Sequence, residues 1–152
     1  MKMLIVEDDE KKRNQLEKFI LLMFPECTVS IAKSYNSAVK AIVNNKYDII
    51  LLDMTMVTFD IGKDEDGGRP QAYAGREVLR QMDRRNIKTP VVVITQFNNF
   101  GEGKDSLTLD ELNASLKRNH TDNYIGAIYY SNINDNWKTQ LIETIKIILE
   151  IE

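Results

Sequence analysis

Four side chains that could carry chemistry come at or directly after the ends of short apolar runs. Glu7 and Asp8 follow "MLIV", Asp53 follows "IILL" and Thr95 follows "VVVI". If these runs are parallel strands, their carboxyl ends lie at one edge of the sheet, so that three carboxylates and a hydroxyl meet there. Such acids stay close together only if a cation neutralises them or their pKa values rise, and Mg²⁺ prefers oxygen ligands of this kind.

Taken singly, each acid has a local explanation. The acidic stretch from Glu7 to Glu10 suits the first turn of a helix, where the macrodipole favours negative charge. Asp53 suits the cap of a turn after its strand. The expected convergence of all three acids with Thr95 favours a functional site over these local roles.

The pattern of apolar residues predicts the elements that position these side chains. Near-continuous apolar runs at 3–6, 49–52, 91–94 and 125–130 are typical of strands buried on both faces, and the alternating run 28–32 suits an edge strand. Between the runs the apolar spacing becomes helical, and Thr108 to Glu111 form a capping-box pattern. The alternation predicts an α/β fold with a doubly wound, five-stranded parallel sheet and helices on both faces.

The composition restricts the class of protein. The chain has 152 residues, 43% of them hydrophobic, and a net charge of -3, which predicts one domain over 1–152 and argues against a nucleic-acid-binding face. No apolar run has the length of a membrane span, and the single Cys27 excludes an internal disulfide. We therefore expect a soluble, cytoplasmic protein in which Cys27 packs as a small hydrophobic residue.

Four motifs in order, "MLIVEDDE", "YDIILLDMTM", "GREVLRQM" and "TPVVVITQ", resemble the receiver domain of two-component response regulators. The resemblance spans roughly 2–150 and implies a flavodoxin-like (βα)₅ fold with strand order 2-1-3-4-5. It also implies a phosphorelay role in signal transduction. In that role the chain is a phosphoprotein that takes a phosphoryl group from a donor and is not otherwise an enzyme.

The resemblance implies a role for each site residue. Asp53 corresponds to the phosphoacceptor, and Thr95 corresponds to the hydroxyl that moves toward the phosphoryl group. Asp8, Asp53 and the backbone carbonyl of Thr55 correspond to the ligands of Mg²⁺ (or Mn²⁺), with Glu7 acting through water. The implied phosphoryl donor is a histidine kinase or a phosphotransfer protein.

The chain also departs from the family pattern. The family has a Lys at the end of the fifth strand, where this sequence has Tyr130 or Ser131, and Gln96 stands where a small residue is usual. The connections 57–74 and 97–106 are longer than such a fold needs. We expect one cation of these loops to fold over the acidic site in place of the missing Lys: Arg69 first, then Lys63 or Lys104.

Three functional interpretations stay open. The first is a stand-alone receiver without an output domain, which signals through contact with a downstream protein or as a homodimer. Apolar residues outside the main stripe of the last helix (Ile142, Ile147 and Ile151) could form such a surface or widen the core. The second is a degenerate receiver that binds its partner without phosphorylation. The third is a small Mg²⁺-dependent phosphohydrolase, which would need a second acid-base group near Asp53.

Overall fold

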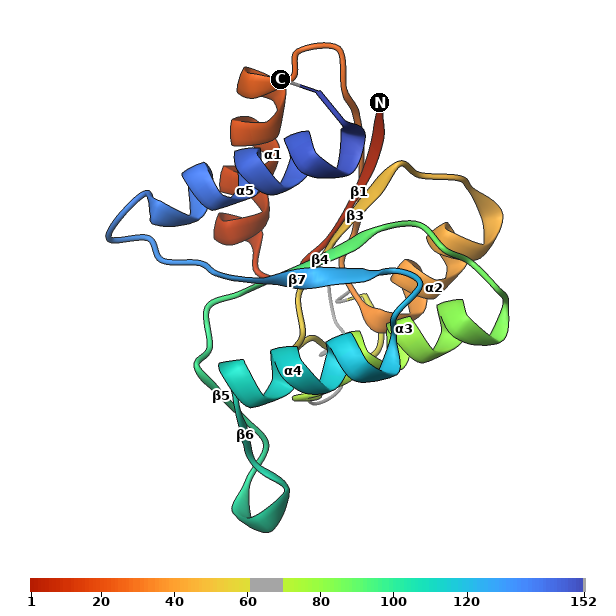
Figure 1. The fold of residues 1–152 in the computed structure, drawn as a ribbon, viewed down its shortest axis with the longest axis vertical. Coiled ribbons are helices and arrows are strands. Elements are labelled where there is room, and N and C mark those ends of the chain that lie inside the picture. Colours follow the sequence, from red (N-terminus) through yellow and green to blue (C-terminus); the bar gives the residue numbers. More distant parts are fainter. Residues whose placement is uncertain (61–69, 152) are drawn as a thin grey trace.

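A five-stranded parallel sheet forms the centre of the protein in this computed structural model, which describes residues 1–60 and 70–151 (Figure 1). The strands are β1 (Lys2–Val6), β2 (Thr28–Ala32), β3 (Ile49–Leu52), β4 (Val91–Thr95) and β7 (Tyr124–Tyr129). Their order is β2-β1-β3-β4-β7, and every neighbouring pair is parallel. Since β7 is the fifth strand of this sheet along the chain, the predicted order 2-1-3-4-5 is confirmed, as is the edge position of 28–32.

Five α-helices cover the two faces of the sheet. They are α1 (Glu10–Met23), α2 (Tyr35–Asn44), α3 (Ala74–Arg84), α4 (Leu109–Asn119) and α5 (Asn136–Leu149). Figure 1 shows α1 and α5 on one face and α2, α3 and α4 on the other, which confirms the doubly wound arrangement. Within the described part of the chain, no helix has both the length and the apolar character needed to cross a membrane.

The central strands contain near-continuous apolar runs because each strand supplies side chains to two cores. In β1, Met3 and Ile5 pack in the core under α1 and α5, whereas Leu4 and Val6 pack in the core under α2, α3 and α4. Successive side chains of a strand point to opposite faces, so a strand covered on both sides needs an unbroken apolar run. Cys27 is buried in the α1–α5 core, as predicted.

Capping side chains begin the helices near the carboxyl edge of the sheet. Asp9 caps α1 by accepting a hydrogen bond from the Lys11 backbone N–H. Thr108 and Glu111 form the predicted capping box at the start of α4, each side chain accepting from the backbone N–H of the other. These caps satisfy N–H groups that the first helical turn leaves unpaired, which fixes where each helix leaves the sheet.

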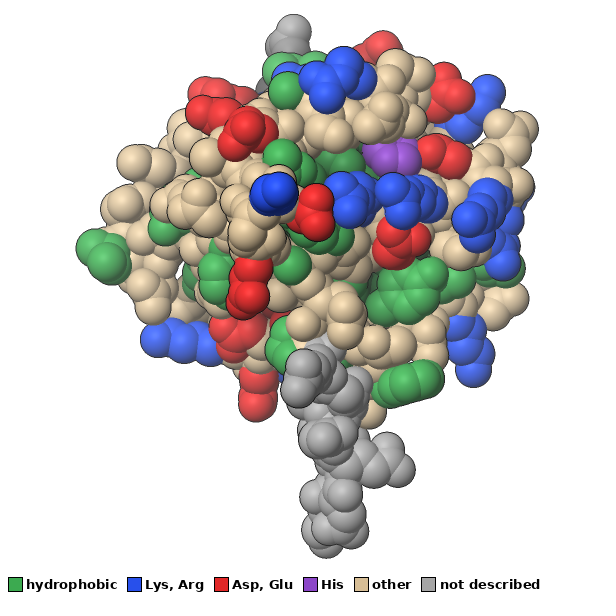
Figure 2. All heavy atoms as spheres, turned by 90° about the horizontal axis from the view of Figure 1, so that it is seen from below, with side chains coloured by type: hydrophobic (Ala, Val, Ile, Leu, Met, Phe, Trp, Pro, Cys, Tyr) green, Lys and Arg blue, Asp and Glu red, His purple; other side chains and the backbone are tan. Residues whose placement is uncertain are grey.

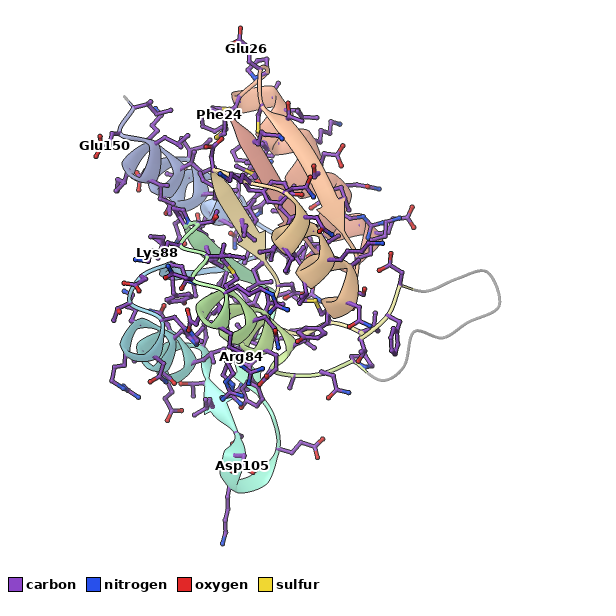
Figure 3. The ribbon with its side chains drawn as sticks, turned by 90° about the vertical axis from the view of Figure 1, so that its right-hand side faces the viewer. Phe24, Glu26, Arg84, Lys88, Asp105 and Glu150 are labelled. Carbon is purple, nitrogen blue, oxygen red and sulfur yellow. The ribbon has the colours of Figure 1, made fainter. Side chains whose placement is uncertain are left out.

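The long connection from β4 to α4 contains a small hairpin, which the sequence analysis did not predict. Strands β5 (Asn99–Phe100) and β6 (Leu107–Thr108) are antiparallel, and the short 3₁₀ helix η1 (Gly103–Asp105) lies between them. The Tyr73 hydroxyl lies 2.9 Å from the Phe100 carbonyl oxygen and 2.8 Å from that of Asp105, which ties the hairpin to the start of α3. Asp105 marks the tip of the hairpin in Figure 3.

Gly75 lets the first turn of α3 approach the end of β3. Its N–H donates to the Met54 carbonyl at 2.9 Å. A Cβ atom at this position would lie 2.8 Å from the Asp53 carbonyl oxygen and 3.0 Å from the Met54 Cα, both backbone atoms. Only glycine therefore allows this contact without a shift of either backbone segment.

Gly75→Ala should reduce the free energy of unfolding by roughly 1–3 kcal/mol, because the added methyl group overpacks a contact between two backbone segments. The measurement is chemical denaturation of the wild type and the variant. Gly126→Ala is the matched control, since a Cβ at Gly126 meets nothing within 4 Å. Equal losses in both variants would show that the contact at Gly75 has no special cost.

Candidate functional site

The three acids predicted from the strand ends do meet in space. Glu7, Asp8 and Asp53 each offer a carboxylate oxygen, and these oxygens lie within 4.8 Å of one another. Glu7 and Asp53 are almost completely buried, whereas Asp8 is half-buried. The site therefore has an interior wall and one side that solvent reaches.

Backbone hydrogen bonds continue the sheet past the strand ends and hold the acids in place. The Glu7 N–H donates to the Ala32 carbonyl and the Asp53 N–H donates to the Val6 carbonyl, each at 3.0 Å. The buried Arg13 guanidinium donates to the carbonyls of Glu7 and Asp8 at 3.2 and 3.3 Å. The turn between β1 and α1 is thus fixed from both sides, which sets the direction of the Glu7 and Asp8 side chains.

Lys12, which our sequence interpretation did not select, lies inside this cluster. Its Nζ atom is 2.5 Å from Glu7 Oε1 and 3.5 Å from Asp53 Oδ1, and its side chain is 1% exposed. The ammonium also donates to the Ile94 carbonyl at 2.7 Å. The buried ammonium therefore lies among three oxygen atoms, of which the Ile94 carbonyl accepts a hydrogen bond and the two carboxylate oxygens offset its charge.

The spacing of α1 contains the signal that could have identified Lys12. Lys12, Leu16 and Ile20 are four residues apart, and all three are buried. A lysine on the apolar stripe of a helix, one turn after an acidic strand end, is directed inward toward those acids. The sequence prediction considered a cation only at the end of the fifth strand and in the two long connections, so Lys12 was not considered.

Burial raises the pKa values of all three acids. For Glu7 the pKa rises from its ordinary value of 4.5 to about 8, mainly through burial and then through the charge of Asp53, while Lys12 opposes the rise. Burial also raises the pKa of Asp53, again against the influence of Lys12. Burial and Glu7 raise the pKa of Asp8. One ammonium therefore does not fully compensate the three carboxyl groups.

The cluster fits a divalent cation. All three groups offer hard oxygen ligands, and Asp8 gives access from the solvent side. Within the described part of the chain, Glu7 Oε1 and Asp53 Oδ1 accept no hydrogen bond of good geometry, although both lie beside the Lys12 ammonium. A bound cation would stabilise the ionised form of these buried carboxyl groups, whose pKa values are raised.

Thr95 and Thr55 lie at the ends of neighbouring strands. Thr95 is the last residue of β4, is fully buried, and accepts a hydrogen bond from the Phe97 N–H at 3.1 Å through its hydroxyl oxygen. The Thr55 hydroxyl donates to the Ala72 carbonyl at 3.2 Å, so its side chain is used to hold the segment before α3. The predicted role of Thr55 involves only its backbone carbonyl, so this side-chain contact leaves that prediction as it stands.

The position at the end of the fifth strand is filled by Tyr130. Its side chain is buried, its hydroxyl contacts the Gln15 side chain, and its ring centroid lies 5.6 Å from Lys12 Nζ and 5.1 Å from the Trp137 ring. Burial raises the pKa of the Tyr130 hydroxyl. Tyr130 is therefore an uncharged, buried neighbour of Lys12 at one side of the acidic site.

Of the three loop cations predicted to fold over the site, only Lys104 is among the described residues. Lys104 lies in η1, between the two strands of the hairpin, and is exposed. The hairpin extends beyond the body of the molecule (Figure 1). Lys63 and Arg69 lie outside the described residues. Among the described residues, the cation in contact with Glu7 and Asp53 is Lys12 of α1.

Comparisons with known proteins agree with this fold. The model of the response regulator receiver domain matches residues 3–123. An uncharacterized protein, y4jR, of Sinorhizobium fredii is 32% identical over 144 residues, which are 93% of this chain and 94% of the relative. The Detocs response regulatory protein DtcB of Enterobacter cloacae is 31% identical over 147 residues, which are 95% and 98% of the two chains.

Solved structures show the same fold at lower identity. The response regulator domain of Thermotoga maritima CheB has a TM-score of 0.64 and 20% identity, covering 100% of this chain and 98% of that chain. The response regulator TrrA of Thermotoga maritima, solved in complex with Mg²⁺-BeF, has a TM-score of 0.62 and 18% identity, covering 97% of both chains. The chain belongs to the response regulator receiver domain family, the signalling domains of two-component systems.

The raised pKa of Glu7 gives a pH dependence that can be measured without metal. Between about pH 4.5 and 8 the folded protein holds a proton on Glu7 that the unfolded chain has released. The free energy of unfolding should therefore fall as the pH rises through this range, and Mg²⁺ should oppose the fall by favouring the ionised acids. Urea denaturation at several pH values in a chelating buffer measures the pH dependence of the free energy of unfolding without metal, and added Mg²⁺ measures the opposing effect.

Glu7→Gln provides the control, because it removes the group whose protonation causes the slope. Its unfolding free energy should vary less with pH than that of the wild type over the same range. Identical slopes in the two proteins would show that Glu7 is ionised throughout.

Proposed function

We propose that this receiver accepts a phosphoryl group on Asp53 from a histidine kinase or a phosphotransfer protein. One observation carries the proposal: the buried Asp53 carboxylate, at the end of β3, lies within 4.8 Å of two further acids and beside a buried lysine. An acid surrounded by charges of both signs at a strand end is a candidate for chemistry at its carboxylate oxygen.

In the proposed reaction a carboxylate oxygen of Asp53 forms a bond to phosphorus. The bond from phosphorus to the donor atom breaks, and the leaving group takes its electron pair. Asp8, Asp53 and the Thr55 carbonyl would hold Mg²⁺, with Glu7 acting through water. The bound ion would neutralise the phosphoryl oxygens and orient them for in-line transfer.

The residues around Asp53 would then register the added charge. Thr95 would turn its hydroxyl toward the phosphoryl group and give up its present contact with the Phe97 N–H. That exchange would alter the chain after β4, which leads into the hairpin and α4. A change in this surface is a means of signalling to a downstream protein by contact.

The surface is suited to protein partners. On the face seen in Figure 2, acidic and basic side chains are interspersed with hydrophobic ones, and the net charge is -3. Direct binding of nucleic acid depends on clustered positive charge. We therefore propose a downstream protein as the partner and a single receiver domain over 1–152 as the signalling unit.

One observation favours a second candidate function, a binding module that works without phosphorylation. Lys12 pairs with Glu7 at 2.5 Å and lies 3.5 Å from Asp53. An internal ion pair of this kind can keep the acidic site in a single state. The experiment on Asp53 distinguishes the two functions.

Incubation with acetyl phosphate and Mg²⁺ should add one phosphoryl group to the wild-type protein, measured by intact mass and labile to hydroxylamine. Asp53→Asn should gain none, because an amide is not a nucleophile for phosphorus under these conditions. Asp110→Asn, at an exposed acid of α4, is the control and should be labelled like the wild type. If the wild type stays unlabelled while Mg²⁺ is bound, the phosphorylation-independent module is the better account.

Mg²⁺ or Mn²⁺ should bind with a stoichiometry of one, measured by calorimetry or through the fluorescence of Trp137, the single tryptophan. Asp8→Asn should weaken the affinity at least about tenfold, since one charged ligand is lost. Glu10→Gln changes an exposed acid of the same stretch and should leave the affinity unchanged. Equal weakening by both substitutions would indicate general charge attraction without a defined site.

A further inference from the structure

We propose that Lys12 of α1 supplies the cationic contact to the phosphoryl group on Asp53, so that this receiver compensates the added charge from a helix and not from the end of its fifth strand. The inference rests on the proposed function of Asp53. It assigns to Lys12 a role that is distinct from holding the metal.

The position of the ammonium is the first argument. Lys12 Nζ lies 3.5 Å from Asp53 Oδ1, so a phosphoryl group added to this carboxylate comes within reach of the flexible lysine side chain. Nζ also donates to the carbonyl of Ile94 in β4 at 2.7 Å. This hydrogen bond holds the end of the Lys12 side chain between α1 and β4. The side chain is therefore directed at the reacting acid before any phosphoryl group arrives.

The charge balance is the second argument. A phosphoryl group brings a charge of about −1.5 to −2 and three strong acceptor oxygens. Lys12 now pairs with Glu7 at 2.5 Å, and a phosphoryl group nearby offers the ammonium a stronger partner than one carboxylate. We expect Lys12 to turn from Glu7 toward Asp53 and to keep its bond to Ile94.

The surroundings of Lys12 explain how this shift would be transmitted. Ile94 directly precedes Thr95, so the lysine and the hydroxyl act on the same end of β4. The Tyr130 ring lies 5.6 Å from Nζ, and Trp137 of α5 packs on Tyr130. A movement of Lys12 would thus change contacts at β4 and at Tyr130, which packs on Trp137. The fluorescence of Trp137 should therefore report the movement.

Beryllofluoride, a phosphoryl mimic that binds without a covalent step, gives a direct test. Its affinity is measured by Trp137 fluorescence at saturating Mg²⁺ for the wild type, Lys12→Met, Lys12→Arg and Lys11→Met. Lys12→Met should weaken binding by about tenfold or more, since a charge-assisted contact is lost. Lys12→Arg should retain most of the affinity, and Lys11→Met, at an exposed lysine of the same turn, should match the wild type.

Two further variants keep the test decisive. Lys12→Gln, whose amide can still donate to the Ile94 carbonyl, replaces Lys12→Met if circular dichroism shows the latter to be unfolded. Lys12→Met combined with Tyr130→Lys should recover affinity, because it brings a lysine to the site from the strand end. Hydroxylamine-labile mass gain from acetyl phosphate should follow the same ranking.

The outcomes separate the two proposals. Wild-type protein that binds no beryllofluoride and accepts no phosphoryl group contradicts the function proposed for Asp53, and the role of Lys12 falls with it. Wild-type protein that does both, with folded Lys12→Met or Lys12→Gln equal to it, contradicts the role of Lys12 alone. In that case the lysine serves only the ion pair with Glu7.

Discussion

The contact of the Lys12 ammonium with Glu7, beside Asp53, is the interaction on which the arrangement of this protein's site depends. Burying two carboxylates at adjacent strand ends is costly, and the ammonium that joins them offsets part of that cost. The pairing also connects three elements, because α1 carries the cation while β1 and β3 carry the acids. Its position therefore fixes the first turn of α1 against the sheet.

Lys12 compensates the buried carboxyl groups only in part, so the site can still be stabilised by a second cation. Even with Lys12 in place, burial raises the pKa of Glu7 to about 8 and raises the pKa of Asp53. A site with excess negative charge and insufficient compensation is stabilised by any cation that enters from the solvent side, where Asp8 lies.

The fold could be predicted because its determinants are local. An unbroken apolar run such as Ile49 to Leu52 indicates a strand covered on both sides, and the order of the acids along the chain places them at one edge. The hairpin after β4 could not be predicted, since strands as short as Asn99–Phe100 leave little periodicity to detect.

The site could be predicted only in part, for a related physical reason. Acids at strand ends follow from the sequence, because the end of a strand determines where the next side chain lies. The direction of the Lys12 side chain depends on how α1 is rotated against the sheet, which becomes clear only when Lys12 is placed on the same stripe as Leu16 and Ile20. Family resemblance also directed attention to the end of the fifth strand, where the buried Tyr130 stands.

The β5–β6 hairpin is closed at its base, and this has a consequence for chain length. Asn99 pairs with Thr108, and the Leu109 N–H donates to the Asn98 carbonyl at 2.8 Å. The two ends of the hairpin are therefore in contact with each other. As a result, the distance from β4 to α4 does not depend on how many residues the hairpin contains. Segments can be lengthened, shortened or exchanged beyond this base while Thr95 and the start of α4 keep their separation.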